Sequence, residues 1–150
     1  MIITFVGHSS FVGNDKYEKQ LLLFLSEIVG DDSVEMYLGD YGMFDSFAYN
    51  CCKKYKENHP NVTLVFVTPY LGDDYINRRL KYNEKVFDTI VYPPIENVPK
   101  RFAITYRNQY MVDQSDFIVC YVTHRYGGAY KTYSYAKRNK KFILNLGELT

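Results

Sequence analysis

Apolar runs alternate with amphipathic segments along most of the chain. Short runs rich in β-branched and aromatic residues, each closed by a glycine, a proline or a polar turn, predict strands. These strands cover residues 2–6, 34–38, 62–67, 87–91, 116–122 and 141–146. Apolar residues at helical spacing predict helices over residues 17–28, 44–55, 101–114 and 129–137. The polar stretch 70–85 is expected to form a long loop or a short irregular helix.

The predicted strands are apolar throughout, which is typical of a parallel sheet covered on both faces. With right-handed crossovers, the order of elements predicts an α/β fold, a Rossmann-like three-layer sandwich with a mainly parallel sheet. A length of 150 residues suits one compact domain, and no shift in composition marks a boundary. Residues 1–150 are therefore expected to form a single domain.

Composition and charge limit the partners and the cellular compartment that the sequence favours. The formal net charge of +1 gives no field that would make nucleic acid the default partner. No apolar run approaches the ~18 residues of a membrane span, and the N-terminus lacks a signal-peptide pattern. Three cysteines, two of them adjacent, fit neither a disulfide framework nor a zinc-binding CxxC pair. We expect a cytoplasmic protein with no membrane contact, no metal site and no resident cofactor.

Loops that follow the strands deserve close inspection, because ligands bind beyond the carboxyl ends of such sheets. Residues 7–10, 39–42 and 123–128 form three of these loops, and the last two carry glycines just before a predicted helix. Backbone N–H groups and the dipole at a helix N-terminus attract phosphate. Each loop alone is more typical of a tight turn. Two glycine loops at one sheet edge make an anion site as well supported as a pair of turns.

Arg107 and Asn108 lie in the predicted helix before the fifth strand. This arginine is either a surface charge or a fork that holds phosphate with two hydrogen bonds. The basic residues between positions 78 and 85 are interleaved with acidic ones and favour a solvated surface over a basic lid. Cys51 and Cys52 are expected to be small core residues.

The same stretches carry a resemblance to a known family. They are Gly7-His8, residues 39–45, Arg107-Asn108, residues 111–116, Gly127-Gly128 and residues 135–137. The chain resembles the SLOG superfamily, which includes the LOG phosphoribohydrolases and the DprA/Smf DNA-processing proteins, and it is most similar to the YpsA-like branch of small bacterial and phage proteins. The resemblance spans nearly the whole chain. It implies a nucleotide or nucleotide-derived ligand between the glycine loops, and a homodimer.

The chain also departs from that family. In the LOG branch an arginine and a glutamate act on the N-glycosidic bond of a nucleoside monophosphate, and Arg107 matches the arginine. Where those enzymes read GGxGT followed closely by Glu, this chain reads GGAYKTYS from Gly127 onward. Ser9 stands where YpsA-like proteins tend to carry an arginine after Gly-His. These departures favour binding over hydrolysis.

Three functions therefore fit these residues. The leading one is a cytosolic domain that binds or senses a nucleotide-like small molecule. The second is an N-glycosidase of nucleoside monophosphates that uses another carboxylate, with Asp45 the nearest by loop position. The third is a single-stranded DNA binder, which the near-zero net charge disfavours, so nucleic acid is not the expected partner. The expected ligand-binding residues are Gly7, His8, Ser9, Gly39, Asp40, Gly42, Asp45, Arg107, Asn108, Gly127, Gly128 and Thr132; no catalytic residue is assigned.

Overall fold

The described residues form one parallel sheet. The computed structural model describes residues 1–72 and 76–150, and its six strands lie in the order β4-β3-β2-β1-β5-β6. Every neighbouring pair is parallel. The strands are β1 (Ile2–Gly7), β2 (Val34–Leu38), β3 (Val62–Val67), β4 (Thr89–Val91), β5 (Phe117–Tyr121) and β6 (Phe142–Asn145). The prediction of a mainly parallel sheet is confirmed.

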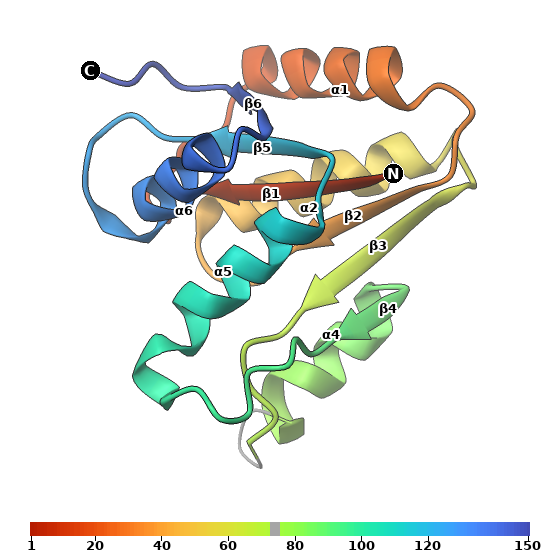
Figure 1. Ribbon diagram of the computed structural model, residues 1–150. Coiled ribbons are helices and arrows are strands. Elements are labelled where there is room, and N and C mark those ends of the chain that lie inside the picture. The colour runs from red at the N-terminus through yellow and green to blue at the C-terminus, as the bar shows by residue number, and fades with distance from the viewer. Residues whose placement is uncertain (73–75) are drawn as a thin grey trace.

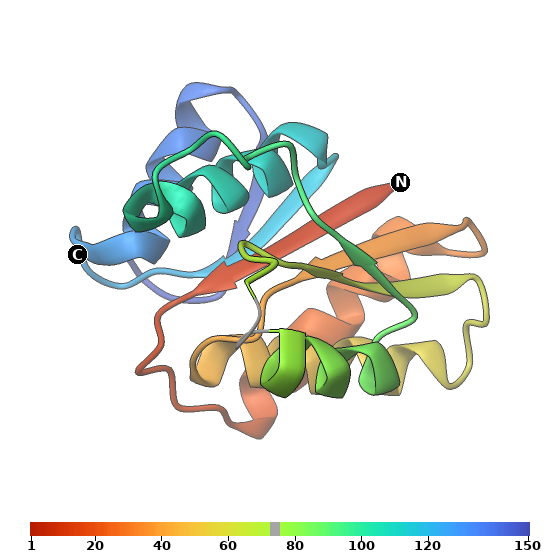
Figure 2. The same cartoon turned by 90° about the horizontal axis from the view of Figure 1, so that it is seen from below.

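Helices cover both faces of this sheet (Figures 1 and 2). One layer contains α1 (Asp15–Val29), α2 (Met43–Lys56) and α4 (Lys81–Val86). The opposite layer contains α5 (Ala103–Gln114) and α6 (Gly127–Arg138). The chain is therefore the three-layer α/β sandwich that the apolar strands predicted.

Apolar side chains of β1 fill the core between the sheet and α1 and α2. Ile3 and Phe5 are buried there, and so are the adjacent cysteines Cys51 and Cys52 of α2, as expected. Burial raises the pKa of the Cys51 thiol to about 12, so it stays protonated at neutral pH. These cysteines act as small apolar core residues.

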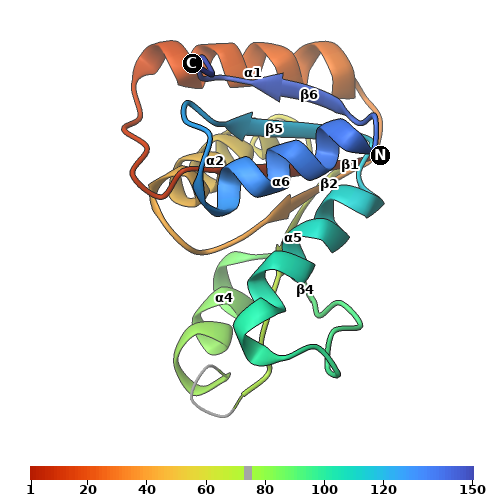
Figure 3. The ribbon, with the colours of Figure 1, turned by 60° about the vertical axis from the view of Figure 1, so that its left-hand side comes forward.

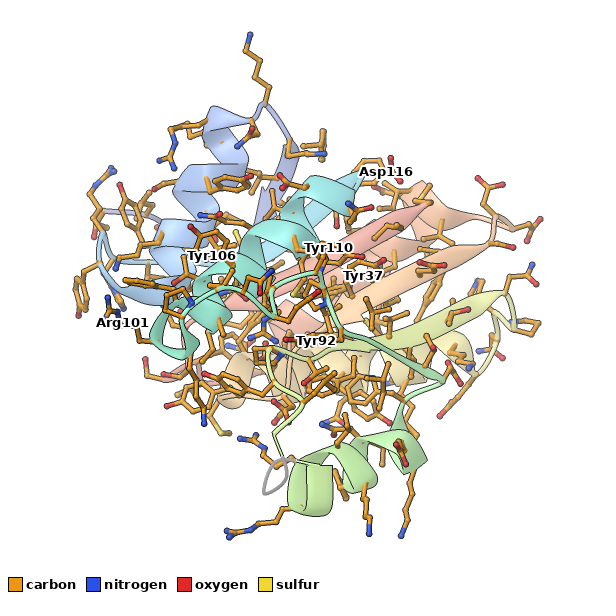
Figure 4. The ribbon with its side chains drawn as sticks, turned by 60° about the horizontal axis from the view of Figure 1, so that its bottom comes forward. Tyr37, Tyr92, Arg101, Tyr106, Tyr110 and Asp116 are labelled. Atoms are coloured by element: carbon orange, nitrogen blue, oxygen red, sulfur yellow. The ribbon has the colours of Figure 1, made fainter. Side chains whose placement is uncertain are left out.

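Tyrosines lie between β2 and α5 on the second face of the sheet. Figure 4 shows Tyr37 of β2 and Tyr110 of α5 in one region of this face, with Tyr92 nearby. Tyr37 is buried and hydrogen-bonded to Tyr110, and burial is the main reason that its pKa rises to about 12. Tyrosines thus take part in the packing between β2 and α5.

Differences from the predicted elements concern their ends. A short π-helix (Ile76–Leu80) leads directly into α4 in the stretch expected to be irregular, and residues 73–75 lie outside the described part. The fourth strand starts at Thr89, because Phe87 ends α4 and packs its ring against Phe66 and Tyr49. A 3-10 turn (Lys100–Phe102) precedes α5, and α6 begins at Gly127 rather than at residue 129.

The position of β1 defines where a ligand fits. From β1 the chain builds outward to β2, β3 and β4, then returns to add β5 on the other side of β1. Strand order therefore reverses beside β1, which is where doubly wound sheets bind ligands, beyond the carboxyl ends of the strands. Figure 3 shows the loops after β1 and β5 at this end of the molecule.

Candidate functional site

A cleft of about 430 Å³ opens beyond the carboxyl ends of β1, β2 and β5. This volume lies in the range of small-molecule sites. Nine of the expected ligand-binding residues line it: Gly7, His8, Ser9, Gly39, Asp45, Arg107, Asn108, Gly127 and Gly128. The two glycine loops expected at one sheet edge thus face a single cavity.

Three expected residues lie outside this lining and have other contacts. The Asp40 carboxylate accepts a hydrogen bond from Asn83 Nδ2 at 3.0 Å and lies 3.2 Å from Arg79 Nη2. Gly42 has a φ of 93°, a conformation that favours glycine, where the chain enters α2. The Thr132 hydroxyl donates to the Gly128 carbonyl at 2.9 Å, inside the first turns of α6.

The amino end of α6 has the features of an anion site. Gly127 opens the helix with a φ of 88°, and no described side chain caps this end through a hydrogen bond. A Cβ atom added at Gly127 or Gly128 would meet no described atom within 4 Å. The first-turn N–H groups therefore border open space in the cleft, where the helix dipole favours a negative charge.

Asp45 and Arg107 lie together at the floor of the cleft. A Cβ atom on Gly39 would sit 2.8 Å from Asp45 Oδ2 and 3.2 Å from Arg107 Nη1, so both charged groups lie against this glycine. Burial raises the pKa of Asp45 to about 6. The Tyr41 N–H, which donates to Asp45 Oδ2 at 2.9 Å, and the Arg107 charge act in the opposite direction. Asp45 therefore exchanges a proton close to neutral pH.

Arg107 is a buried residue and not a surface charge. Its side chain is 5% exposed, and Nη1 donates to the Val67 carbonyl at 2.8 Å. The arginine thus links α5 to the end of β3 while it lines the cleft. Its replacement by alanine would therefore disturb the core as well as the cleft.

His8 connects two loops of the site. Its Nε2 accepts a hydrogen bond from the Thr123 backbone N–H at 3.0 Å, which requires this nitrogen to be unprotonated. Burial and the neighbouring His124 lower the pKa of His8 below its ordinary value of 6.5. A neutral imidazole therefore holds the end of β1 to the loop that leads into α6.

Several lining residues were absent from the sequence-based set. His124 and Tyr126 come from the loop between β5 and α6, Tyr41 from the loop before α2, and Ile104 and Met111 from α5. His124 and Tyr126 flank Arg125 directly before the two glycines, and this proximity was the signal that could have found them. Helical periodicity alone could not assign Ile104 or Met111 to a cleft.

Comparisons with known proteins identify the fold class. No family model and no curated protein matches the sequence. Among solved structures, DNA processing protein A (DprA) from Helicobacter pylori is similar, with a TM-score of 0.61 and 12% identity over 95% of this chain and 63% of that chain. DprA from Streptococcus pneumoniae gives a TM-score of 0.61 and 12% identity over 94% of this chain and 48% of that one. The structure of TM1055 gives a TM-score of 0.54 and 12% identity over 95% of this chain and 71% of that chain.

These likenesses show a shared architecture: the chain has the Rossmann-like α/β fold of these solved structures. It spans less than two thirds of either DprA chain. The H. pylori DprA binds single-stranded DNA. Within residues 1–72 and 76–150, no helix has the length and apolarity to cross a membrane. The same residues contain no group of three His, Cys, Asp or Glu side chains that could hold a metal ion.

Proposed function

We propose that the cleft binds a nucleotide or a nucleotide-derived molecule, with its phosphate at the amino end of α6. The observation that carries this proposal is the open space beside Gly127 and Gly128, at a helix end without a side-chain cap among the described residues. Gly39 and residues 7–9 line the same cavity. This arrangement offers backbone donors to an anion at the switch in strand order.

The proposal includes membership of the SLOG superfamily and, within it, of the YpsA-like branch. The motifs at Gly7-His8, Arg107-Asn108 and Gly127-Gly128 support the superfamily, and so does the DprA-like fold. We also propose that the protein acts by binding or sensing, because no glutamate follows the second glycine pair closely.

Gly128→Val is the sharpest test of the phosphate position. A side chain at this position has room in the free protein, so the fold is expected to survive while the branched side chain obstructs the ligand. Loss of a charge-assisted contact of ~1.5–3 kcal/mol corresponds to about a ten- to a hundredfold loss of affinity. Calorimetric titration with a panel of nucleoside monophosphates measures the affinity of the parent and the variant. Gly72→Val is the matched control, because a side chain at Gly72 also has open space and this residue lies outside the cleft. Equal binding by parent and Gly128→Val would place the phosphate elsewhere.

Native mass spectrometry of the purified protein adds a separate test. It identifies any co-purified nucleotide and counts subunits in one measurement. A homodimer with one nucleotide per chain is the expected result. A ligand that contains no phosphate would contradict the proposal.

Asp45 supports a second candidate, the hydrolysis of an N-glycosidic bond in a nucleoside monophosphate. Its carboxyl group lines the cleft and has a pKa of about 6, which suits a group that gives or takes a proton near neutrality. Release of free base from nucleoside monophosphates at ordinary enzyme turnover, abolished in Asp45→Asn, would establish this activity. We expect little or no release.

The similarity to H. pylori DprA favours a third candidate, binding of single-stranded DNA. The net charge of +1 weighs against a strong backbone-driven interaction. Fluorescence anisotropy with labelled oligothymidylate at two salt concentrations separates the candidates. Salt-sensitive binding of the oligonucleotide, with no binding of mononucleotides, would favour the DNA candidate over the proposed one.

A further inference from the structure

Three aromatic rings form a continuous stack along the cleft. The His8 and His124 rings lie 3.6 Å apart between centroids with an angle of 10° between their planes. The His124 and Tyr126 rings lie 3.8 Å apart at 20°. All three residues line the cavity. The stack begins at His8, which is 7% exposed, and ends at Tyr126, which is 70% exposed.

We propose that Tyr126 is the platform on which the base of the ligand stacks, so that the base extends the row of rings outward. This inference rests on the proposed function and names the part of the ligand that reaches the loop between β5 and α6. One face of the Tyr126 ring covers His124, and the high exposure of Tyr126 leaves surface for a further ring. Bases stack on aromatic side chains without strong sequence preference, because every base has a π-face.

The stack is held in place before any ligand arrives. His8 is fixed by its bonds to Thr123 and Tyr121, and His124 is enclosed between two rings. A platform that is already ordered loses little conformational entropy when a ring lands on it. Preorganisation therefore favours this end of the stack over an isolated exposed tyrosine.

The platform adjoins the proposed phosphate site directly. Tyr126 is the residue before Gly127, and the first turn of α6 follows it. The ring and the first amide donors therefore belong to consecutive residues that line the same cleft. A molecule with an aromatic base and a phosphate matches both features at once. Inorganic phosphate or a sugar phosphate matches the second feature alone.

One polar atom in the stack supports a ligand at this place. The Nδ1 atom of His124 is buried and has no hydrogen-bond partner among the described residues. Buried polar atoms in folded proteins are nearly always paired. His124 lines the cleft, so an adjustment of its ring that exposes Nδ1 would let a bound ligand or an ordered water supply the missing partner.

The test compares two probes that share a sugar phosphate, adenosine 5′-monophosphate and ribose 5-phosphate. Tyr126→Leu is expected to weaken the first by about 5- to 150-fold and to leave the second unchanged. Tyr126→Phe keeps the ring and is expected to bind both like the parent. Tyr106→Leu is the matched control, because Tyr106 is 48% exposed on α5 and does not line the cleft (Figure 4).

The outcomes separate this inference from the proposed function. Equal loss of both probes in Tyr126→Leu, or loss of neither, overturns the stacking platform. The phosphate site is then judged by Gly128→Val alone. A parent protein that binds neither probe overturns both. The fluorescence of 2-aminopurine riboside 5′-monophosphate gives an independent readout: quenching on binding is expected with the parent and Tyr126→Phe and is expected to vanish with Tyr126→Leu.

Discussion

The imidazole of His8 accepts a hydrogen bond from the Thr123 backbone N–H at 3.0 Å, across 115 positions of the chain. The bond joins the end of β1 to the loop that carries His124, Tyr126 and Gly127. It therefore holds together the two loops that line the cleft from opposite ends of the sequence, the one after β1 and the one after β5. The Asn145 side chain also holds this loop, because it accepts a hydrogen bond from the Val122 N–H and donates one to the Val122 carbonyl.

Replacement of His8 is expected to lower stability. His8→Leu replaces the imidazole by an apolar side chain that still fills the buried position, and it leaves the Thr123 N–H without its acceptor, at a cost of about 1–3 kcal/mol. His8→Gln is expected to recover part of this loss, because its amide oxygen can accept the same bond. Urea unfolding of the three proteins measures the differences, and equal stability of the leucine and glutamine variants would contradict the role of the bond.

Asp45→Asn is expected to change how stability depends on pH. The pKa of Asp45 rises from an ordinary 3.8 to about 6 on folding, so the native state binds more protons than the unfolded state in this window. Stability of the parent therefore falls as pH rises through this window, by about 2 kcal/mol from this group between pH 4 and pH 6. The asparagine variant lacks that loss. Its stability relative to the parent is expected to rise over the same interval and to level off above pH 6.5.

Denaturant unfolding at pH 4, 5, 6 and 7 measures this difference. The lowered pKa of His8 acts in the other direction, because the unfolded state alone takes up that proton as pH falls below 6.5. Subtracting the parent from the variant removes the His8 contribution, which both proteins share. A difference that does not change with pH would contradict the prediction.

Gly127 and Gly128 are expected to respond in opposite ways to alanine. Gly127 has a φ of 88°, so Gly127→Ala forces a side chain into the left-handed region and destabilises by about 1–2 kcal/mol. Gly128 lies in α6 with open space at its Cβ position, and Gly128→Ala is expected to stabilise by about 0.5–1 kcal/mol. Thermal unfolding compares the two variants. Equal midpoints would contradict the assigned backbone conformations.

Asn145 is expected to be needed for the loop after β5. Its Oδ1 accepts from the N–H groups of Val122 and Gly147 at 3.0 and 3.1 Å, and its Nδ2 donates to the Val122 carbonyl at 2.9 Å. Asn145→Ala removes all three bonds and is expected to lower stability by about 1–3 kcal/mol. Asn145→Asp keeps the acceptor and loses the donor, so an intermediate effect is expected in the same urea experiment.

The fold followed from local patterns in the sequence, because strands buried on both faces must be apolar throughout. The runs at 34–38 and 62–67 coincide with β2 and β3. The position of the two glycine loops followed from the rule that parallel strands end at one edge. Local patterns could not place Phe87, whose ring belongs to the core because Tyr49 and Phe66 lie beside it.

Local sequence patterns could not predict the contacts between segments that are far apart in the chain. The stack of His8, His124 and Tyr126 depends on how two loops meet, and the sequence contains no local mark of it. The burial of Arg107 likewise depends on the carbonyl of Val67 at the end of β3. Asp40 shows the reverse case: its loop reaches the cleft, while its carboxylate turns to Asn83 and Arg79.

The central place of β1 has a consequence for synthesis on the ribosome. β1 pairs with β2 early, but its other edge waits for β5, where Ile3 lies opposite Phe117. At translation rates of about 5–20 residues per second, the roughly 80 residues between the end of β2 at Leu38 and the start of β5 at Phe117 take on the order of 4–16 s to emerge. During that interval the nascent chain has a central strand with one unpaired edge and only part of the cleft. Under the proposed function, nucleotide occupancy would then mark chains whose late half has docked, and it would distinguish them from stalled or truncated products.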